Sequence, residues 1–256
     1  MMNIFSQLVK SLYSPLDIAR FRFQGIGKTI LFLFFLTLIT TIPTFITLTS
    51  FINQTIDEGK NILSDDIPPF EIRNDELQTD LTEPYTKSGN DFSIVIDNSS
   101  NSFNPEYDNT FTIAFLQTKM LIATAGNHQE IPYNQLSGLS ISDQSLAEYL
   151  EMFESSLIIF LPIIYLITYI FSSFMTFMKV ILFSFVGVLI AKALQRKLNY
   201  RQSFRITAYA ITLPTLFFSI MNLLNTIVPG GLLLNSLVTT VMLYLTIKEI
   251  PQPKTP

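Results

Sequence analysis

The chain has 256 residues, 48% of them hydrophobic, a mean hydropathy of +0.39 and a formal net charge of −4 at pH 7. It has no Cys and one His, His128, which excludes disulfides, thiolate chemistry and a zinc site of several His ligands within one chain. The charge is divided: residues 53–154 hold 18 acids and 4 bases, a net −14, and the remainder holds 12 bases and 2 acids, a net +10. Because short basic segments stay in the cytoplasm, this division predicts a membrane protein with an acidic part outside.

Residues 1–28 predict a cytoplasmic, amphipathic arm. Phe5, Leu8 and Leu12 recur at helical spacing, and Ser14-Pro15 is typical of an N-cap followed by Pro at the first helical position. We expect one or two interfacial helices on the inner surface of the membrane. The alternative is a soluble helical arm packed on the rest of the protein.

Residues 29–52 predict the first transmembrane helix. The run is uncharged for 24 residues, which exceeds the ~20 needed to cross a bilayer. Basic residues precede it, acidic Asp57 and Glu58 follow it, and its end offers no Ala-x-Ala cleavage pattern. We therefore expect an uncleaved anchor with the N-terminus in the cytoplasm, continuing outward as a helix toward Asp66.

Residues 53–154 predict an acidic extracytoplasmic α+β domain with a small antiparallel sheet of four to five strands. Alternating apolar residues predict strands at 70–73, 92–97, 110–115 and 119–124, with an edge strand at 131–133. One face of this sheet is expected to be buried: Phe92, Ile94, Ile96, Phe111, Ile113 and Phe115. A capping box, Ser145-Leu146-Ala147-Glu148, predicts the start of a helix that leads into the next apolar run.

Residues 155–248 predict a helical bundle that begins with an ambiguous apolar run, about 157–194. This run is long for one crossing and short for two, and its only charges are Lys179 and Lys192. The middle of the run has no Gly or Pro for a turn, and two crossings would place the following basic residues outside. We therefore favour one long helix with a cytoplasmic extension.

Two further helices are expected at 206–228 and 232–247, joined by the turn Pro229-Gly230-Gly231, with a Pro-rich cytoplasmic tail at 249–256. The predicted fold is thus a membrane α-helical bundle of four transmembrane helices with an inserted, small antiparallel β-rich extracytoplasmic domain. Five crossings, with the C-terminus outside, is the alternative.

Polar side chains recur at helical spacing along the last two predicted spans: Thr215, Ser219, Asn222, Asn225, Asn235 and Thr239. Hydrogen bonding between helices, at about 0.6 kcal/mol per bond, is the simpler interpretation, and a polar cavity for a solute is the alternative. No Asp or Glu lies deep in a predicted span, so a carboxylate proton relay is not expected. Lys179 is expected to extend toward the inner interface.

Two charged segments are candidates for surface sites. The basic segment holds Lys192, Arg196, Lys197, Arg201 and Arg205, which can contact anionic lipid head groups or serve only as a topological anchor. The loop from Asp97 to Asp108 has alternating oxygen side chains but lacks the Gly and Glu of a calcium loop, so we expect a solvated hairpin loop.

Two segments carry a resemblance to a known family. Lys10-Ser11-Leu12-Tyr13-Ser14-Pro15 with Arg20 to Thr29, and Asn199 to Arg205 with Ala208-Tyr209-Ala210 and Leu213-Pro214, are similar to domain-of-unknown-function family 1189. These are uncharacterised integral membrane proteins of low-GC Gram-positive bacteria, distantly Yip1-like. The resemblance implies the same layout of anchor, acidic outer domain and bundle, and it transfers no active site.

The sequence therefore predicts a multi-pass cell-membrane protein that is not an enzyme, uses no cofactor and binds no metal or nucleic acid. We expect an accessory, scaffold or sensing subunit whose outer domain contacts a ligand or partner. Its expected partners are the lipid bilayer and another membrane protein or transporter complex. The alternative is a small solute transporter or channel component, linked to maltodextrin or sugar uptake only by a label on some relatives.

Overall fold

A computed structural model describes residues 3–64, 67–89, 92–102, 111–124, 127–136 and 140–252. The chain divides into two compact units. The helical unit comprises Met1–Leu48 and Pro162–Pro256, and the sheet unit comprises Thr49–Leu161. Four helical segments of the described chain are long and apolar enough to cross a membrane: Ile26–Leu63, Asp143–Ala193, Tyr200–Leu223 and Gly231–Lys248.

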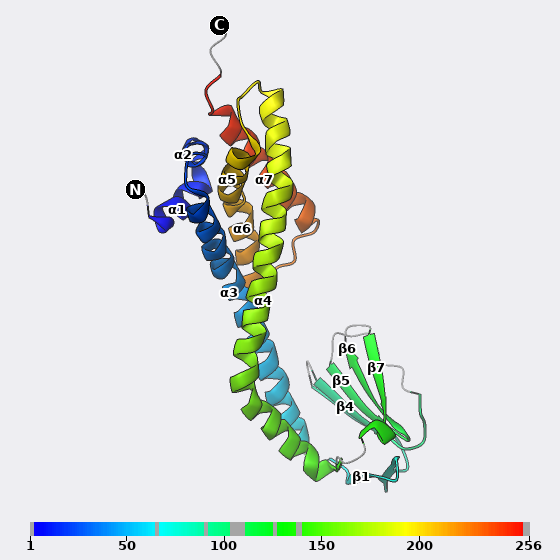
Figure 1. Ribbon diagram of the computed structural model, residues 1–256. Coiled ribbons are helices and arrows are strands. Elements are labelled where there is room, and N and C mark those ends of the chain that lie inside the picture. Colours follow the sequence, from blue (N-terminus) through cyan, green and yellow to red (C-terminus); the bar gives the residue numbers. More distant parts are fainter. Residues whose placement is uncertain are drawn as a thin grey trace. The chain divides into compact units, whose positions relative to one another are not determined.

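Seven α-helices are described (Figure 1). Five lie wholly in the helical unit: α1 (Ile4–Tyr13), α2 (Pro15–Phe21), α5 (Tyr200–Ala210), α6 (Thr212–Leu223) and α7 (Gly231–Lys248). The two longest, α3 (Ile26–Ser64) and α4 (Asp143–Ala193), have residues in both units.

The core of the helical unit is built around Tyr209 of α5. Its fully buried ring lies 4.5 Å from the ring of Phe21 and 4.3 Å from that of Phe32, measured between centroids. Its hydroxyl donates to side-chain oxygens of Gln24, at 2.8 Å, and Gln7, at 3.1 Å. A buried tyrosine needs such a partner, so these bonds tie the N-terminal arm to α5.

The N-terminal arm forms the two expected helices. The Ser14 side chain caps α2, and Pro15 occupies its first turn, as the sequence predicts. Ile18, Ala19 and Phe21 of α2 belong to the buried core, so the arm packs on the protein. The alternative expectation, that the arm packs on the rest of the protein, is therefore supported as far as packing is concerned.

The ambiguous apolar run forms part of one continuous helix, α4, of 51 residues. The expectation of one long helix is therefore confirmed. The capping box lies three residues before the expected one and is formed by Ser142 and Ser145. The Ser142 N–H donates to Ser145 Oγ at 2.8 Å, and the Ser145 N–H donates to Ser142 Oγ at 3.2 Å. The helix accordingly begins at Asp143.

The helix expected at 206–228 differs at both ends. A capping box between Asn199 and Gln202 starts α5 at Tyr200, and the helical path is interrupted at Ile211 before α6. Beyond α6, Asn225 adopts a left-handed conformation (φ 50°), which ends the helix before the expected Val228.

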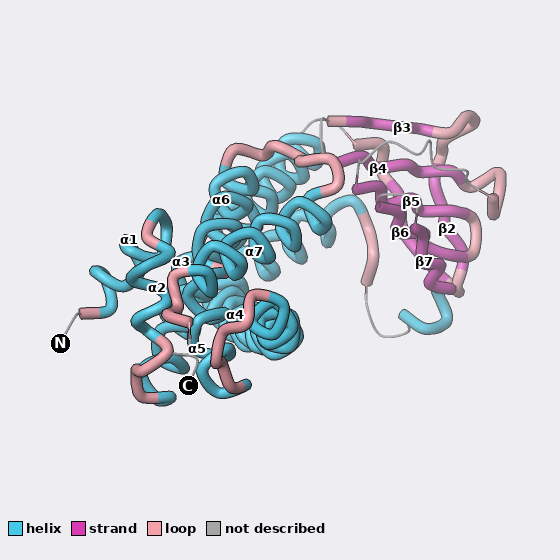
Figure 2. The backbone as a smooth tube through the Cα atoms, turned by 90° about the horizontal axis from the view of Figure 1, so that it is seen from above, coloured by secondary structure: helices cyan, strands magenta, loops and turns pink. Residues whose placement is uncertain are grey.

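The sheet unit contains a five-stranded sheet in the order β3-β4-β5-β6-β7 (Figure 2). The strands are β3 (Tyr85–Ser88), β4 (Phe92–Asp97), β5 (Phe111–Leu116), β6 (Lys119–Thr124) and β7 (Asn127–Pro132). β7 is an edge strand, as expected, but it covers Asn127–Pro132 and not 131–133, because Tyr133 begins a short 3-10 helix (Tyr133–Leu136).

A separate hairpin accounts for the first expected strand. β1 (Phe70–Arg73) pairs with β2 (Glu76–Thr79), and Asn74 and Asp75 both have positive φ, the geometry of a two-residue hairpin turn. β1 therefore does not join the larger sheet, and that place is taken by β3. The sequence of β3 gave no signal because its side chains alternate only between half-buried and exposed positions.

The sheet is antiparallel at three of its four pairings, but β4 and β5 run parallel. The segment after Asp97 is therefore a crossover between parallel strands and not the expected hairpin loop, because a hairpin joins only antiparallel strands. Within the loop from Asp97 to Asp108, positions 103–108 lie outside the described residues.

The expected buried face is present. Phe92, Ile94, Ile96 and Phe115 lie in one buried cluster, with Phe111 and Ile113 packed against it. Phe70 and Leu77 of the hairpin belong to the same cluster, together with Ile62, Tyr133 and Ile141.

Candidate functional site

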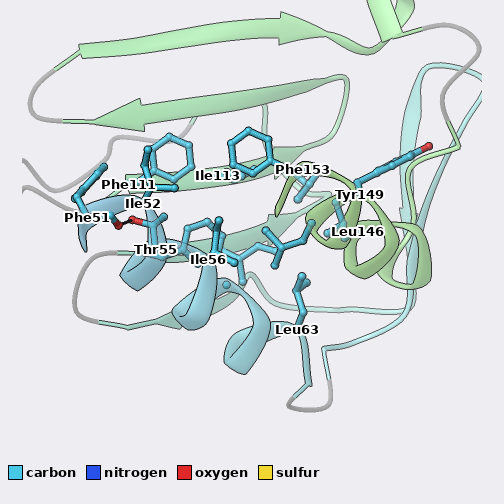
Figure 3. A pocket seen from close by; sticks show the side chains of 15 residues that line it. Phe51, Ile52, Thr55, Ile56, Leu63, Phe111, Ile113, Leu146, Tyr149 and Phe153 are labelled. Carbon is cyan, nitrogen blue, oxygen red and sulfur yellow. Dashed lines mark hydrogen bonds between the residues drawn. The ribbon is translucent and has the colours of Figure 1, made fainter. Parts of the chain in front are cut away.

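An apolar pocket of about 440 Å³ lies within the sheet unit (Figure 3). Three elements form its walls. α3 contributes Phe51, Ile52, Thr55, Ile56, Gly59 and Leu63. The sheet contributes Phe92, Ile94, Phe111, Ile113 and Phe115, and α4 contributes Leu146, Tyr149, Leu150 and Phe153.

The spacing of these residues explains why they share one pocket. On α3 and α4 they recur at three- and four-residue intervals, which place them on one side of each helix. On β4 and β5 they alternate, which places them on one face of the sheet. A volume of this size lies within the ~300–1,000 Å³ range of small-molecule sites.

Both hydroxyl groups among the lining side chains already donate to backbone carbonyls. Thr55 Oγ1 donates to the Phe51 carbonyl at 2.9 Å, and the Tyr149 hydroxyl donates to the Ser140 carbonyl at 2.9 Å. In Figure 3 the Tyr149 hydroxyl points away from the pocket. No charged side chain is among the lining residues, so the pocket surface is suited to hydrocarbon.

Polar contacts beside the pocket hold its walls together. Glu58 Oε2 on α3 accepts a hydrogen bond from the Phe92 N–H of β4 at 2.9 Å. Lys60 and Glu154 form an ion pair between α3 and α4 at 2.5 Å, and this hydrogen bond raises the pKa of Lys60. These contacts join each helix to another wall without placing charge in the pocket.

The polar stripe predicted on the last two spans is divided between different helices. Ser219 donates to the Thr40 carbonyl at 3.0 Å, and Asn222 donates to Thr44 Oγ1 at 3.3 Å, so both bind α6 to α3. Thr215 Oγ1 is buried and has no hydrogen-bond partner among the residues that the structure describes.

The remaining stripe residues lie elsewhere. Asn225 is in the connection between α6 and α7, and Thr239 donates to the Asn235 carbonyl of its own helix at 2.8 Å. The side chain of Asn235 accepts a hydrogen bond from Lys179. The expected extension of Lys179 toward the interface is thus replaced by a contact between α4 and α7.

Two of the five residues of the predicted basic segment are half-buried, and the other three are exposed. Arg205 donates to the Arg22 carbonyl at 2.9 Å and is half-buried, as is Arg196. Lys192, Lys197 and Arg201 are exposed. The exposed three remain candidates for lipid head groups.

Two further observations concern the single histidine and groups that could hold a metal ion. His128 is an exposed residue of β7. Within the described residues, no group of three or more His, Asp or Glu side chains is placed to hold a metal ion.

The apolar pocket itself was not predicted from the sequence. The sequence pattern places the pocket residues of β4 and β5 on one buried sheet face and Phe51 and Ile52 in the first transmembrane helix, but periodicity within one element does not show that these elements meet. The signal that is present is the apolar periodicity of α3 beyond the predicted span, where Ile56 and Leu63 continue the face that contains Ile52.

Comparisons with known proteins add one match. A family model described as Protein of unknown function (DUF1189) matches residues 5–247, which confirms the resemblance noted in the sequence. No curated protein and no solved structure matches.

Proposed function

The chain belongs to the DUF1189 family of proteins of unknown function, and we propose that it is a multi-pass cell-membrane protein whose sheet unit binds an apolar ligand outside the cell. In this proposal it is not an enzyme. It acts as an accessory or sensing subunit, and α3 and α4 connect the ligand site to the membrane.

A single observation carries this proposal: the two longest helices each combine a membrane-length apolar segment with one wall of the pocket. On α4 many large apolar side chains are exposed, among them Ile158 at 81% and Ile167 at 61%. Exposed apolar surface of this length is unfavourable in water and favourable in lipid.

The charge division supports the orientation. The acidic segment, residues 53–154, lies within the sheet unit. The exposed bases Lys192, Lys197 and Arg201 lie at or after the C-terminal end of α4. The positive-inside rule then assigns both termini to the cytoplasm, with four crossings.

The hydrogen bonds of Ser219 and Asn222 favour this role over transport. Both side chains bind α6 to α3, so they serve helix packing in the way expected of polar groups in lipid. Solute flux through liposomes that is abolished by Asn222→Leu would reverse this preference.

Single-cysteine labelling tests the topology, because the chain has no native Cys. A membrane-impermeant thiol reagent added to intact cells should label His128→Cys, but Gln195→Cys and Gln252→Cys only after permeabilisation. Labelling of Gln252→Cys from outside would show five crossings, and protection of His128→Cys would refute an extracytoplasmic sheet unit.

Purification tests the accessory role. Protein extracted in mild detergent should retain a stoichiometric membrane partner, and a clean monomer at native expression level would count against an accessory subunit. A clean monomer would not contradict the ligand site, which requires a separate binding experiment.

A further inference from the structure

We propose that the apolar pocket of the sheet unit holds the acyl chain of a lipid or fatty acid. This inference rests on the proposed function and names its ligand class. It follows from the chemistry, the dimensions and the position of the pocket along α3.

The chemistry of the lining favours a ligand without polar groups in its buried part. The two lining hydroxyls donate to backbone carbonyls, and no lining residue carries a charge. A sugar or a nucleotide placed here would leave its own donors and acceptors unsatisfied, which is strongly unfavourable in an apolar site. A hydrocarbon chain has no such groups.

The dimensions suit one chain. The lining residues on α3 extend from Phe51 to Leu63, which corresponds to about 18 Å of helix at 1.5 Å per residue. A single leaflet of the bilayer core is about 15 Å thick, so this length is similar to that of one lipid chain. A volume of about 440 Å³ is also within the ~300–1,000 Å³ range of sites that bury small ligands, so the pocket has room for a hydrocarbon chain.

The position along the chain gives the ligand a source. Phe51 and Ile52 line the pocket and are also the last residues of the predicted transmembrane run, residues 29–52. In the proposed topology this run ends at the outer surface of the membrane. A lipid chain can therefore move from the outer leaflet along α3 into the pocket without crossing a charged segment.

The test uses the absence of Trp from the native chain, which lets one introduced Trp report alone. Phe111→Trp places the reporter in the pocket wall. His128→Trp places it at an exposed position of the same sheet, and Phe174→Trp places it on the exposed apolar side of α4. Each full-length variant is reconstituted in bilayers, and quenching by brominated acyl chains is measured.

Quenching of Phe111→Trp by brominated phospholipid identifies a membrane lipid chain as the ligand, and quenching by brominated free fatty acid alone identifies a free chain. His128→Trp should remain unquenched in both cases. If Phe111→Trp is not quenched while Phe174→Trp is, the acyl-chain site is refuted and the membrane placement stands. If Phe174→Trp is not quenched, the proposed function itself fails.

A blocking variant makes the test specific to the pocket. Thr55→Asp introduces a charge beside the ligand path and should weaken binding of brominated fatty acid to Phe111→Trp by at least about tenfold, because an unpaired charge is costly against hydrocarbon. Gln54→Asp adds the same charge at a neighbouring exposed residue outside the lining and should leave binding unchanged. Equal binding by the two variants would contradict a chain lying against Thr55.

Discussion

Gly187 lies on α4 at a close contact with α5, and we predict that Gly187→Ala disrupts this contact. A Cβ at this position would lie 2.4 Å from Ser203 Oγ, which donates to the Ser184 carbonyl at 2.7 Å. The hydroxyl must move, so its buried hydrogen bond to the Ser184 carbonyl is lost. Overpacking and the lost bond together destabilise by about 2–3 kcal/mol, and the better helix propensity of Ala offsets up to about 1 kcal/mol.

The expected net loss is therefore about 1–2 kcal/mol in the free energy of unfolding, measured by titrating the protein in mild micelles with a denaturing detergent. Gly27→Ala is the matched control, because Gly27 is also helical but a Cβ there meets no atom within 4 Å. That substitution should be neutral or slightly stabilising.

A double variant tests the cause of the loss. Ser203→Ala removes the obstructing oxygen, and the remaining Cβ would lie 3.7 Å from the new methyl group, an ordinary contact. Gly187→Ala combined with Ser203→Ala should then be about as stable as Ser203→Ala alone. Strictly additive losses, or a Gly187→Ala protein as stable as the parent, would refute the steric explanation.

Three further predictions concern the hydrogen bonds of three individual side chains. Tyr133→Phe removes the donor to the Leu116 carbonyl at 2.7 Å and should lower the free energy of unfolding of the sheet unit by about 1–2 kcal/mol. Burial raises the pKa of Tyr133, so the unfolded state ionises first and the parent should lose stability as pH rises above about 10. Tyr133→Phe should lose less over this range, and an equal loss would contradict the assignment. Tyr209→Phe removes the hydroxyl that donates to the N-terminal arm. Because Ile18 is fully buried in the parent protein, a cysteine introduced as Ile18→Cys reports opening of the arm, and its thiol labelling should be faster in the Tyr209→Phe variant. An unchanged labelling rate would show that these bonds do not hold the arm. Glu58→Ala removes the acceptor of a β4 N–H and should destabilise the sheet unit by about 1.5–3 kcal/mol, with Glu58→Gln closer to the parent; coincident unfolding curves for Glu58→Ala and the parent would refute this.

Features set by local sequence could be predicted. The cap at Ser14, the strands at 92–97 and 119–124 and the continuity of the long apolar run each depend on neighbouring residues or on a simple period. A helix face or a strand face has the same pattern wherever it later packs. This is why the buried face containing Phe92 and Ile94 could be identified correctly.

Features set by pairing between distant segments could not be predicted. The direction of β5 relative to β4 depends on the path of the crossover, and alternation is the same for parallel and antiparallel strands. The capping box at Ser142 and Ser145 was missed because the Glu at position 148 matched the usual pattern better. The apolar pocket required three elements to be placed together, and periodicity describes one element at a time.

The N-terminal arm shows why its two sequence interpretations are compatible. On α1 the polar residues Gln7 and Ser11 are fully buried, whereas Phe5, Val9 and Tyr13 are 62%, 52% and 68% exposed. A water-soluble helix has the opposite arrangement. Here the polar side faces the protein, where Gln7 accepts a hydrogen bond from the core, and the apolar side is left for another apolar medium. In the proposed topology that medium is the inner leaflet, so the arm packs on the bundle and lies in the interface at the same time.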